Sequence, residues 1–521
     1  MTDNKYDRQL RLWGWEGQKK LSEASILLIN ATAAGTEALK NLILPGVGFI
    51  TILDDKLVEE RDLGSNFFVS EEGIGKSRGE NAKDLLVELN EDVKGDHIDG
   101  SPSKYLRAKD KDFFSQFSFI IAWDMTETQV EELTEIGDDL GIAIIILRSY
   151  GMIGYLRQYK KEHTCIQSKP ADKQLDDLRL AHPFEALQKY ALEFDSEQLN
   201  LMEHGHVPYV IILIKALHKW KEVHEGKLPS SFEEKDEFKA IIRGMARNFS
   251  KELNYEEAIQ NAFKAFSYEA VPFEIQEILD DPKANSEEFH SKFWTLVAAL
   301  KQFVSERGSL PVNGKVPDMT STSDFYITLQ KIYQEKARED RERMESILSE
   351  QAEKNGKMDI IFDEDEVKIF WENWRNLEVT RMNSFSQERN QPETEDVSAE
   401  FLDSDSSIEW YVAVRWAEMF RSKKGRYAGD LQENIEEDVI EMSGFVPKLL
   451  KDLGAPEEFK FNYNHIHEIV RYSNSCLHNI AAVLGGVAAQ EAVKLITEQY
   501  TPLNHTFIFD GVHSKSQVFN I

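Results

Sequence analysis

The sequence has few cysteines, and the two that it has are not clustered. Cys165 and Cys476 are the only cysteines in 521 residues, and more than half of the chain separates them. A disulfide framework needs several paired cysteines and a CxxC-type zinc site needs close pairs, so the sequence excludes both. We predict a structural thiol at each position and a reducing compartment, the cytosol or the nucleus.

The sequence also lacks an excess of basic residues and any long hydrophobic run. Its formal net charge is -31, and no basic stripe offsets it, so phosphate backbones and anionic lipid heads would be repelled. Apolar runs such as 210–213 are too short to span a bilayer, and the N-terminus lacks the apolar stretch of a signal peptide. We therefore expect a protein that binds neither nucleic acid nor a membrane.

The first third of the chain alternates apolar runs with helical periodicity. A chain of 521 residues with 41% hydrophobic residues is expected to form two or three domains. Gly35 opens one predicted helix, and apolar residues from 82 to 89 mark a second. Between the helices the sequence predicts buried strands at 26–29, 49–53, 119–122 and 142–147. Such alternation is typical of a parallel, doubly wound α/β sheet.

Long helical patterns replace this alternation from about residue 168 to about residue 464. They predict helices at 210–223, 289–304 and 323–347, and an acidic, apolar-poor stretch at 388–407 predicts a mobile loop. The α/β pattern then returns, with a helix at 478–497 that is rich in small residues and a strand at 507–509. We therefore expect one α/β domain, split by a large and mainly helical insertion, with boundaries at 1–165, 166–473 and 474–521.

The turn after the first predicted strand lies where many α/β proteins bind phosphate. It runs from Asn30 to Gly35 and keeps only the third glycine of the G-x-G-x-x-G pattern, with Thr32 in place of the second. Asp54 and Asp55 follow about twenty residues after Gly35, at the spacing of a ribose-binding carboxylate. The frame is that of a nucleotide site, but the missing glycines favour a plain strand-helix connection over a working site.

Three segments of the chain follow sequence patterns of a known family: Tyr6-Asp7-Arg8-Gln9-Leu10, Leu42 to Gly48, and His478 to Ala482 with Gly485 to Glu491. They resemble the adenylation fold of ubiquitin-activating enzymes and of their bacterial sulfur-carrier relatives. Lys76, after Gly75, and Asp124 occupy the positions where this family keeps an ATP-contacting lysine and an aspartate. The resemblance implies a Rossmann-like adenylation fold.

The departures from this family fall on its catalytic positions. Lys56 replaces a carboxylate of the D-x-D motif, Ser65 replaces the arginine of N-x-N-R-Q-F, and the insertion contains no cysteine to serve as the nucleophile. Adenylation relies on cations that stabilise charge on the transferring phosphate. The resemblance therefore implies that Gly35, Asp54, Lys76 and Asp124 are vestigial, and that this chain binds neither ATP nor a metal ion.

The same losses are typical of one chain of the heterodimeric activating enzymes. Further segments resemble the regulatory, non-catalytic subunits of the neddylation pathway: Arg148 to Tyr155, Leu175 to Leu180 and Leu310 to Met319. The resemblance implies a catalytic partner subunit that holds ATP and magnesium. It also implies a ubiquitin-like modifier as substrate and a conjugating enzyme as its acceptor.

Arg8 is the one residue of this chain to which the resemblance gives a catalytic role. In the family, the arginine of the opening motif reaches across the dimer to the ATP phosphates of the other subunit, so Arg8 is expected to act in trans. A surface ion pair with Asp7 or Glu16 is the alternative for Arg8. For the whole chain, the alternatives are a self-sufficient adenylating or dinucleotide-binding enzyme, and a pure scaffold.

Two further groups of residues favour structural interpretations. His204 and His206 stand near Glu203, but no other ligand lies at a recognised spacing, which favours a surface loop over a metal site. Trp371 and Trp374 are at helical spacing and are expected to be buried in a helical core.

Overall fold

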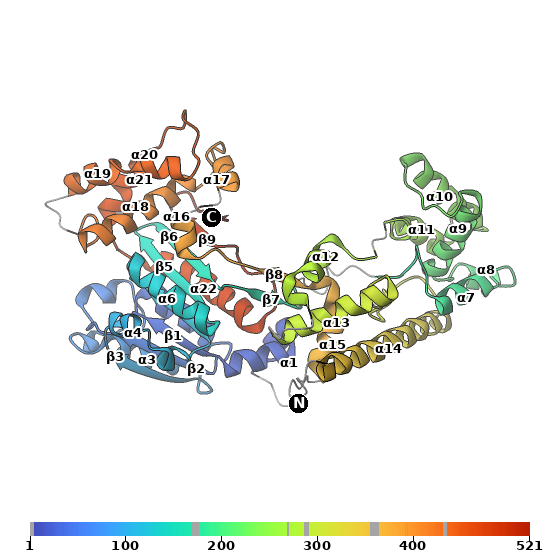
Figure 1. Cartoon of the computed structure of the whole chain (residues 1–521), viewed down its shortest axis with the longest axis horizontal. Helices are drawn as coiled ribbons and strands as arrows, with labels where there is room; N and C mark the ends of the chain where they lie inside the picture. Colours follow the sequence, from blue (N-terminus) through green and yellow to red (C-terminus); the bar gives the residue numbers. More distant parts are fainter. Residues whose placement is uncertain are drawn as a thin grey trace. The chain divides into compact units, whose positions relative to one another are not determined.

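A computed structural model describes most of the chain. The described residues are 5–168, 177–267, 270–285, 291–354, 364–390, 392, 394–430 and 435–521. The chain forms two compact units (Figure 1). Unit 1 combines Met1–Cys165 with Val379–Ile521, and unit 2 is Ile166–Glu378.

Unit 1 is built on an eight-stranded sheet with the strand order β10-β9-β6-β5-β4-β1-β2-β3. Strands β3, β2, β1, β4 and β5 are parallel to one another, whereas β6, β9 and β10 are each antiparallel to their neighbours. The strands are β1 (Ser25–Ile29), β2 (Phe49–Asp54), β3 (Lys94–Asp99), β4 (Phe119–Trp123), β5 (Ala143–Tyr150), β6 (Ile153–Tyr159), β9 (Thr506–Asp510) and β10 (Lys515–Phe519). Two short strands, β7 (His163–Cys165) and β8 (Glu378–Thr380), pair separately.

The predicted fold class is confirmed, with a sheet that is mixed instead of wholly parallel. The parallel half contains four of the five predicted strands, because their runs of buried apolar residues are what a strand covered on both faces requires. The fifth, predicted at 507–509, is β9 in the antiparallel half. Strand β3 was not predicted, since its sequence KGDHID has no apolar run and lies at the sheet edge, where polar residues face water. Strands β6 and β10 were not predicted either.

Seven helices accompany the parallel strands: six lie between residues 7 and 140, and the seventh, α22, lies near the end of the chain. They are α1 (Asp7–Glu23), α2 (Ala33–Ile43), α3 (Arg78–Val87), α4 (Pro102–Ala108), α5 (Lys111–Phe114), α6 (Glu127–Leu140) and α22 (His478–Thr497). Helix α22 is long and apolar enough to cross a membrane, but most of it is buried against α2, β5 and β6. Its small residues permit this packing: a Cβ atom at Gly485 would lie 2.5 Å from the Cβ of Glu37 on α2.

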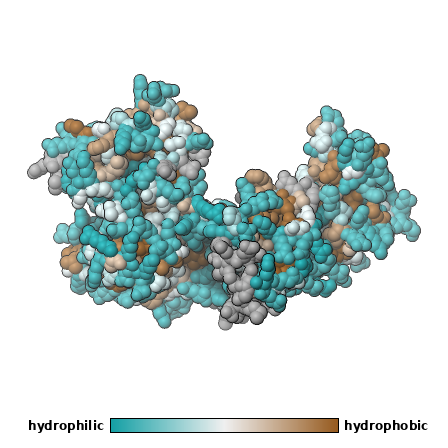
Figure 2. All heavy atoms as spheres, in the orientation of Figure 1, coloured by the Kyte–Doolittle hydropathy of each residue, from teal (hydrophilic) through white to brown (hydrophobic). Residues whose placement is uncertain are grey.

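On the face drawn in Figure 2, apolar residues form small separate patches on a mainly hydrophilic surface.

The chain returns to unit 1 at Val379, not at residue 474 as the sequence analysis placed it. The reason is that helices between residues 385 and 472 cover β5, β6 and β9, and their residues from Val397 onward share a core with Tyr150, Ile153 and Ile508. Buried ion pairs reinforce this packing: Arg148 binds Glu418 at 2.6 Å and Arg157 binds Glu388 at 2.9 Å. The helices are α16 (Phe385–Asn390), α17 (Thr394–Glu400), α18 (Ile408–Lys424), α19 (Ile435–Ser443), α20 (Val446–Asp452) and α21 (Asn464–Tyr472).

Half of the stretch predicted as a mobile loop is helical in the structure. Helices α16 and α17 lie within or overlap residues 388–407, and Val397 and Phe401 are buried in the core under α18. The acidic composition misled the prediction because Glu388 is buried and paired with Arg157. Residues 391 and 393 lie outside the described part of the chain.

Unit 2 is helical, as predicted. The predicted helices at 210–223, 289–304 and 323–347 correspond to α9, α13 and α14, and Trp371 and Trp374 are buried, which confirms their core role. Residues 289 and 290 lie outside the described part of the chain. The helices are α7 (Glu185–Glu193), α8 (Leu201–His204), α9 (Tyr209–Val223), α10 (Phe232–Met245), α11 (Leu253–Gln260), α12 (Phe273–Asp280), α13 (Lys292–Arg307), α14 (Ser323–Lys354) and α15 (Glu364–Asn373).

Candidate functional site

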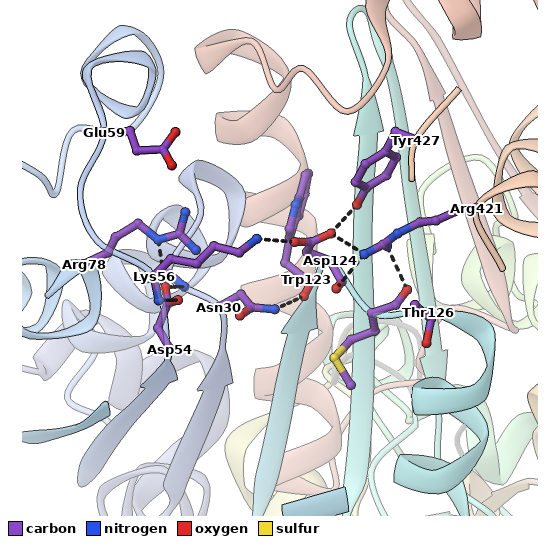
Figure 3. Close-up of polar contacts among 12 residues, drawn as sticks. Asn30, Asp54, Lys56, Glu59, Arg78, Trp123, Asp124, Thr126, Arg421 and Tyr427 are labelled. Atoms are coloured by element: carbon purple, nitrogen blue, oxygen red, sulfur yellow. Dashed lines mark hydrogen bonds and ion pairs between the residues drawn. The ribbon is translucent and has the colours of Figure 1, made fainter. Parts of the chain in front are cut away.

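The candidate site lies where β1, β2 and β4 end, at the carboxyl edge of the parallel strands. This is the edge at which open α/β sheets bind ligands. Asn30, Asp54 and Asp124 stand at the ends of the three strands, and their side chains face the same region (Figure 3). The structure therefore brings together two of the predicted carboxylates and the predicted phosphate turn, all within unit 1.

The turn from Asn30 to Gly35 is held by backbone contacts. Asn30 adopts a left-handed φ of 66° and donates from Nδ2 to the Trp123 carbonyl at 2.7 Å. A Cβ atom at Gly35 would lie 2.7 Å from Leu28, so this glycine allows α2 to pack closely on β1. Thr32 precedes α2, and its hydroxyl oxygen is buried without a hydrogen-bond partner among the described residues. A threonine Cβ therefore stands where a glycine would let phosphate approach.

Asp54 is fully buried, and both of its carboxylate oxygens accept hydrogen bonds from protein groups. Oδ2 accepts from the Ala31 backbone N–H at 2.9 Å and from Arg78 Nε at 2.7 Å. Oδ1 accepts from the Lys56 backbone N–H at 3.0 Å. Arg78 is itself buried, so the pair is a desolvated ion pair at the start of α3. This carboxylate ties the phosphate turn to β2 and α3, and its full burial keeps it from an outside ligand such as a ribose.

Asp124 is neutralised by two cations of its own chain. Its carboxylate accepts from Lys56 Nζ at 2.7 Å and from Arg421 Nη2 at 2.6 Å, and the Tyr427 hydroxyl donates to it as well. Burial by itself would raise the pKa of Asp124, but Arg421 and Lys56 together hold it below its ordinary value. Lys56 therefore occupies the coordination space of Asp124 that a metal ion would need.

Lys76 and Arg8 lie away from these contacts. Lys76 is exposed on the turn before α3, and Arg8 is exposed on α1. Neither side chain has a hydrogen bond or ion pair within the described part of the chain. The alternative for Arg8, a pair with Asp7 or Glu16, is not found there, because Asp7 binds Arg11 at 2.8 Å instead.

Neither cysteine forms a disulfide, and both lie in unit 1. Cys165 is buried at the end of β7. Dense packing raises the pKa of the Cys476 thiol to about 11, although Ser149 and the Ala34 backbone N–H favour its thiolate. A thiol with this pKa is a poor nucleophile at neutral pH, which agrees with the structural role predicted for it.

His204 does not lie on a surface loop, which corrects the sequence analysis. It ends α8, is buried, and its ring binds Glu252 through Nδ1 and the Tyr255 hydroxyl through Nε2 at 3.2 Å. The prediction failed because Glu252 lies 48 residues away in sequence. Within the described ranges, no group of three or more His, Cys, Asp or Glu residues is arranged to hold a metal ion.

Four residues that complete the site were not predicted. Arg78 follows the Gly75-Lys76 motif and could have been noticed as an arginine at a helix start, near Asp54. Asn66 binds the Ala31 carbonyl and the Thr36 hydroxyl, and so holds the phosphate turn. Arg421 and Tyr427 come from the end of α18 and the residues after it, 297 and 303 residues beyond Asp124. No local pattern could have linked them to it.

Comparison with known proteins agrees with this geometry. The model of the ThiF family matches residues 6–521. The chain belongs to the ThiF family. The NEDD8-activating enzyme E1 regulatory subunit of Xenopus laevis is 38% identical, over 100% of this chain and 99% of that protein. The NEDD8-activating enzyme E1 regulatory subunit AXL of Arabidopsis thaliana is 38% identical over 98% of both chains. The NEDD8-activating enzyme E1 regulatory subunit of Danio rerio is 37% identical, over 100% of this chain and 98% of that protein. Within the ThiF family, the chain is therefore a relative of regulatory subunits along its whole length, which confirms the resemblance.

Proposed function

We propose that this chain is the regulatory subunit of a heterodimeric enzyme that activates a ubiquitin-like modifier in the neddylation pathway. The observation that carries the proposal is that the carboxylates at the strand ends, where a nucleotide would bind, are already paired within the chain. Asp54 and Asp124 keep their positions in the fold, but Arg78, Lys56 and Arg421 of the same chain occupy both carboxylates. The full-length similarity to NEDD8-activating enzyme E1 regulatory subunits supports the same conclusion.

In this proposal the chemistry belongs to a catalytic partner subunit. That subunit would hold ATP and magnesium, adenylate the C-terminal glycine of the modifier, and carry the cysteine that forms the thioester. The modifier would then pass to a conjugating enzyme. This chain would bind no cofactor, would stabilise the fold of its partner, and would supply Arg8 to the partner's ATP site. We place the heterodimer in the cytosol or the nucleus, which cell fractionation would test.

A titration calorimetry experiment on the isolated chain tests the proposal. ATP with magnesium should give no heat of binding in the micromolar range, because the phosphate turn lacks two glycines and the carboxylates are already paired. Addition of the catalytic subunit should restore nucleotide binding and modifier adenylation. Micromolar ATP affinity in the chain alone would instead support a self-sufficient enzyme.

A pure scaffold is the remaining candidate. It predicts that no side chain of this subunit affects the rate of adenylation once the heterodimer has formed. Arg8 is exposed and makes no ion pair within the described chain, so its guanidinium is available to a partner subunit, and the Arg8→Ala variant distinguishes the two candidates.

A further inference from the structure

Helix α1, which carries Arg8, is broken by a kink at Gly14. Gly14 has φ 67° and ψ -176°, values that glycine adopts far more readily than residues with a Cβ atom. The break separates a first segment with Arg8 from a second segment that ends at Glu23. Kinks of this kind leave backbone carbonyls of the preceding turn without partners in the helix.

Two side chains from the loop after α22 bind the carbonyls next to this kink. Tyr500 donates its hydroxyl to the Leu12 carbonyl at 3.1 Å, and Gln499 donates from Nε2 to the Trp13 carbonyl at 3.0 Å. Glu498, in the same loop, binds Lys20 of the second segment at 2.6 Å. The loop therefore holds α1 on both sides of its break.

The backbone of this loop is itself strained. Glu498 and Tyr500 have φ values of 56° and 62°, in the left-handed region that is disfavoured for residues with a Cβ atom. Such conformations persist where surrounding contacts impose them, and they gather at functional positions. Here they bring Gln499 and Tyr500 to the kink.

The other end of the Arg8 segment is also fixed. The Tyr6 hydroxyl donates to Asp92 at 2.7 Å and accepts from Asn90 Nδ2 at 3.1 Å. A Cβ atom at Gly46 would lie 2.7 Å from the Tyr6 hydroxyl, so this glycine makes room for the ring. Arg8 thus lies on a segment that is anchored at Tyr6 and at Leu12 and Trp13.

We propose that Gln499 and Tyr500 are positioning residues for Arg8. The inference rests on the proposed function, in which Arg8 acts on the ATP phosphates of the catalytic subunit. An arginine on a loose segment would have to be ordered at each encounter, and that ordering opposes the reaction. Anchoring the segment before the subunits meet removes this cost. The backbone that carries the arginine is then presented in one orientation.

The test uses the assembled heterodimer and the double variant Gln499→Ala/Tyr500→Phe. Two lost hydrogen bonds, each worth a factor of about 2 to 10, should lower kcat for modifier-dependent pyrophosphate exchange about tenfold, with KM for ATP nearly unchanged. In the isolated chain, the amides of residues 8–13 should exchange hydrogen faster in this variant. Tyr326→Phe removes a similar bond to the Val316 carbonyl in unit 2 and should change neither readout.

A double-mutant cycle with Arg8→Ala separates positioning from general stability. If Gln499 and Tyr500 act through Arg8, their double variant should lower kcat no further in the Arg8→Ala background. A further tenfold loss in that background, or unchanged hydrogen exchange at 8–13, would overturn the inference. Faster exchange without any loss of kcat would overturn it too. If Arg8→Ala alone leaves kcat unchanged, the trans role in the proposed function fails, whatever the loop does.

Discussion

Arg8 carries a positive charge that the described part of its own chain does not neutralise. Most exposed arginines either pair with a nearby carboxylate or remain solvated, and such pairs contribute under about 1 kcal/mol. Arg11, one helical turn later, is of that kind, because it binds Asp7 and remains exposed. The two arginines therefore offer a matched comparison on one helix.

We predict that Arg8→Ala slows modifier adenylation by the assembled heterodimer at least about tenfold, because an arginine acting on transition-state phosphate charge can contribute a factor of about 10³ to 10⁵. Pyrophosphate exchange measures the rate, and gel filtration should show an unchanged heterodimer. Arg11→Ala is the control and should stay near the wild-type rate. Equal rates for the two variants would contradict a trans role for Arg8.

At the scale of elements, the buried Asp54–Arg78 pair joins β2 to the start of α3 and to the turn before α2. Removing one member of such a pair leaves a buried charge without compensation. We predict that Asp54→Ala lowers the free energy of unfolding by about 3–5 kcal/mol, as measured in urea. Asp84→Ala, at an exposed carboxylate beside Lys83, should change it by less than about 1 kcal/mol.

The Asp124 contacts join β4 to α18, and they predict a dependence on pH. The folded-state pKa of Asp124 lies below its ordinary value of 3.8, so the stabilisation is complete above the unfolded-state pKa and is lost as the pH falls through the folded-state pKa. Asp124→Asn should therefore destabilise the chain relative to wild type near neutral pH, and the difference should shrink below about pH 4. Thermal unfolding across this range measures it, with the exposed Asp55→Asn as control. A difference that stays constant into acid would show that the ion pairs contribute nothing.

The sequence predicted those helices and strands whose apolar or small residues reflect full enclosure by neighbouring elements. Strands β1, β2 and β4 are continuous apolar runs, and α22 has small residues throughout, because both are enclosed by neighbouring elements. Local sequence could not separate the helices that cover β5 and β6 from the helices of unit 2, because α18 in the first group and α9 in the second are both rich in buried apolar residues. The end of the insertion and the partners Arg421 and Tyr427 depend on tertiary contacts, which only the structure reveals.

At the scale of the whole molecule, unit 1 is discontinuous in sequence but has its own core. Its internal ends, Cys165 and Val379, lie on β7 and β8, which pair with each other, and paired strands are about 4.8 Å apart. A short connection can therefore join them. The helical unit is an insertion between two adjacent positions of a complete α/β domain.

We predict that replacing residues 167–377 with a short Gly-Ser linker leaves unit 1 folded. Circular dichroism should show a cooperative urea transition, because the sheet and both of its buried clusters remain. A variant that also carries Asp54→Ala should unfold at a lower urea concentration, as we predict for the full chain. A gradual, non-cooperative change with denaturant would show that unit 1 depends on unit 2 for its stability.

Because the cation beside Asp124 is Lys56 of the same chain, the stability of this subunit should not depend on the supply of a ligand in the cell. A protein that folds around a bound ligand is stabilised by RT ln(1 + [L]/Kd), so its abundance follows the supply of that ligand. Here the counter-ion of Asp124 is encoded in the chain and is always present at one equivalent. On our proposal that this chain binds neither nucleotide nor magnesium, its fold would gain nothing when either is plentiful and lose nothing when either is scarce. Its partner would meet a docking surface that stays constant through changes in energy charge.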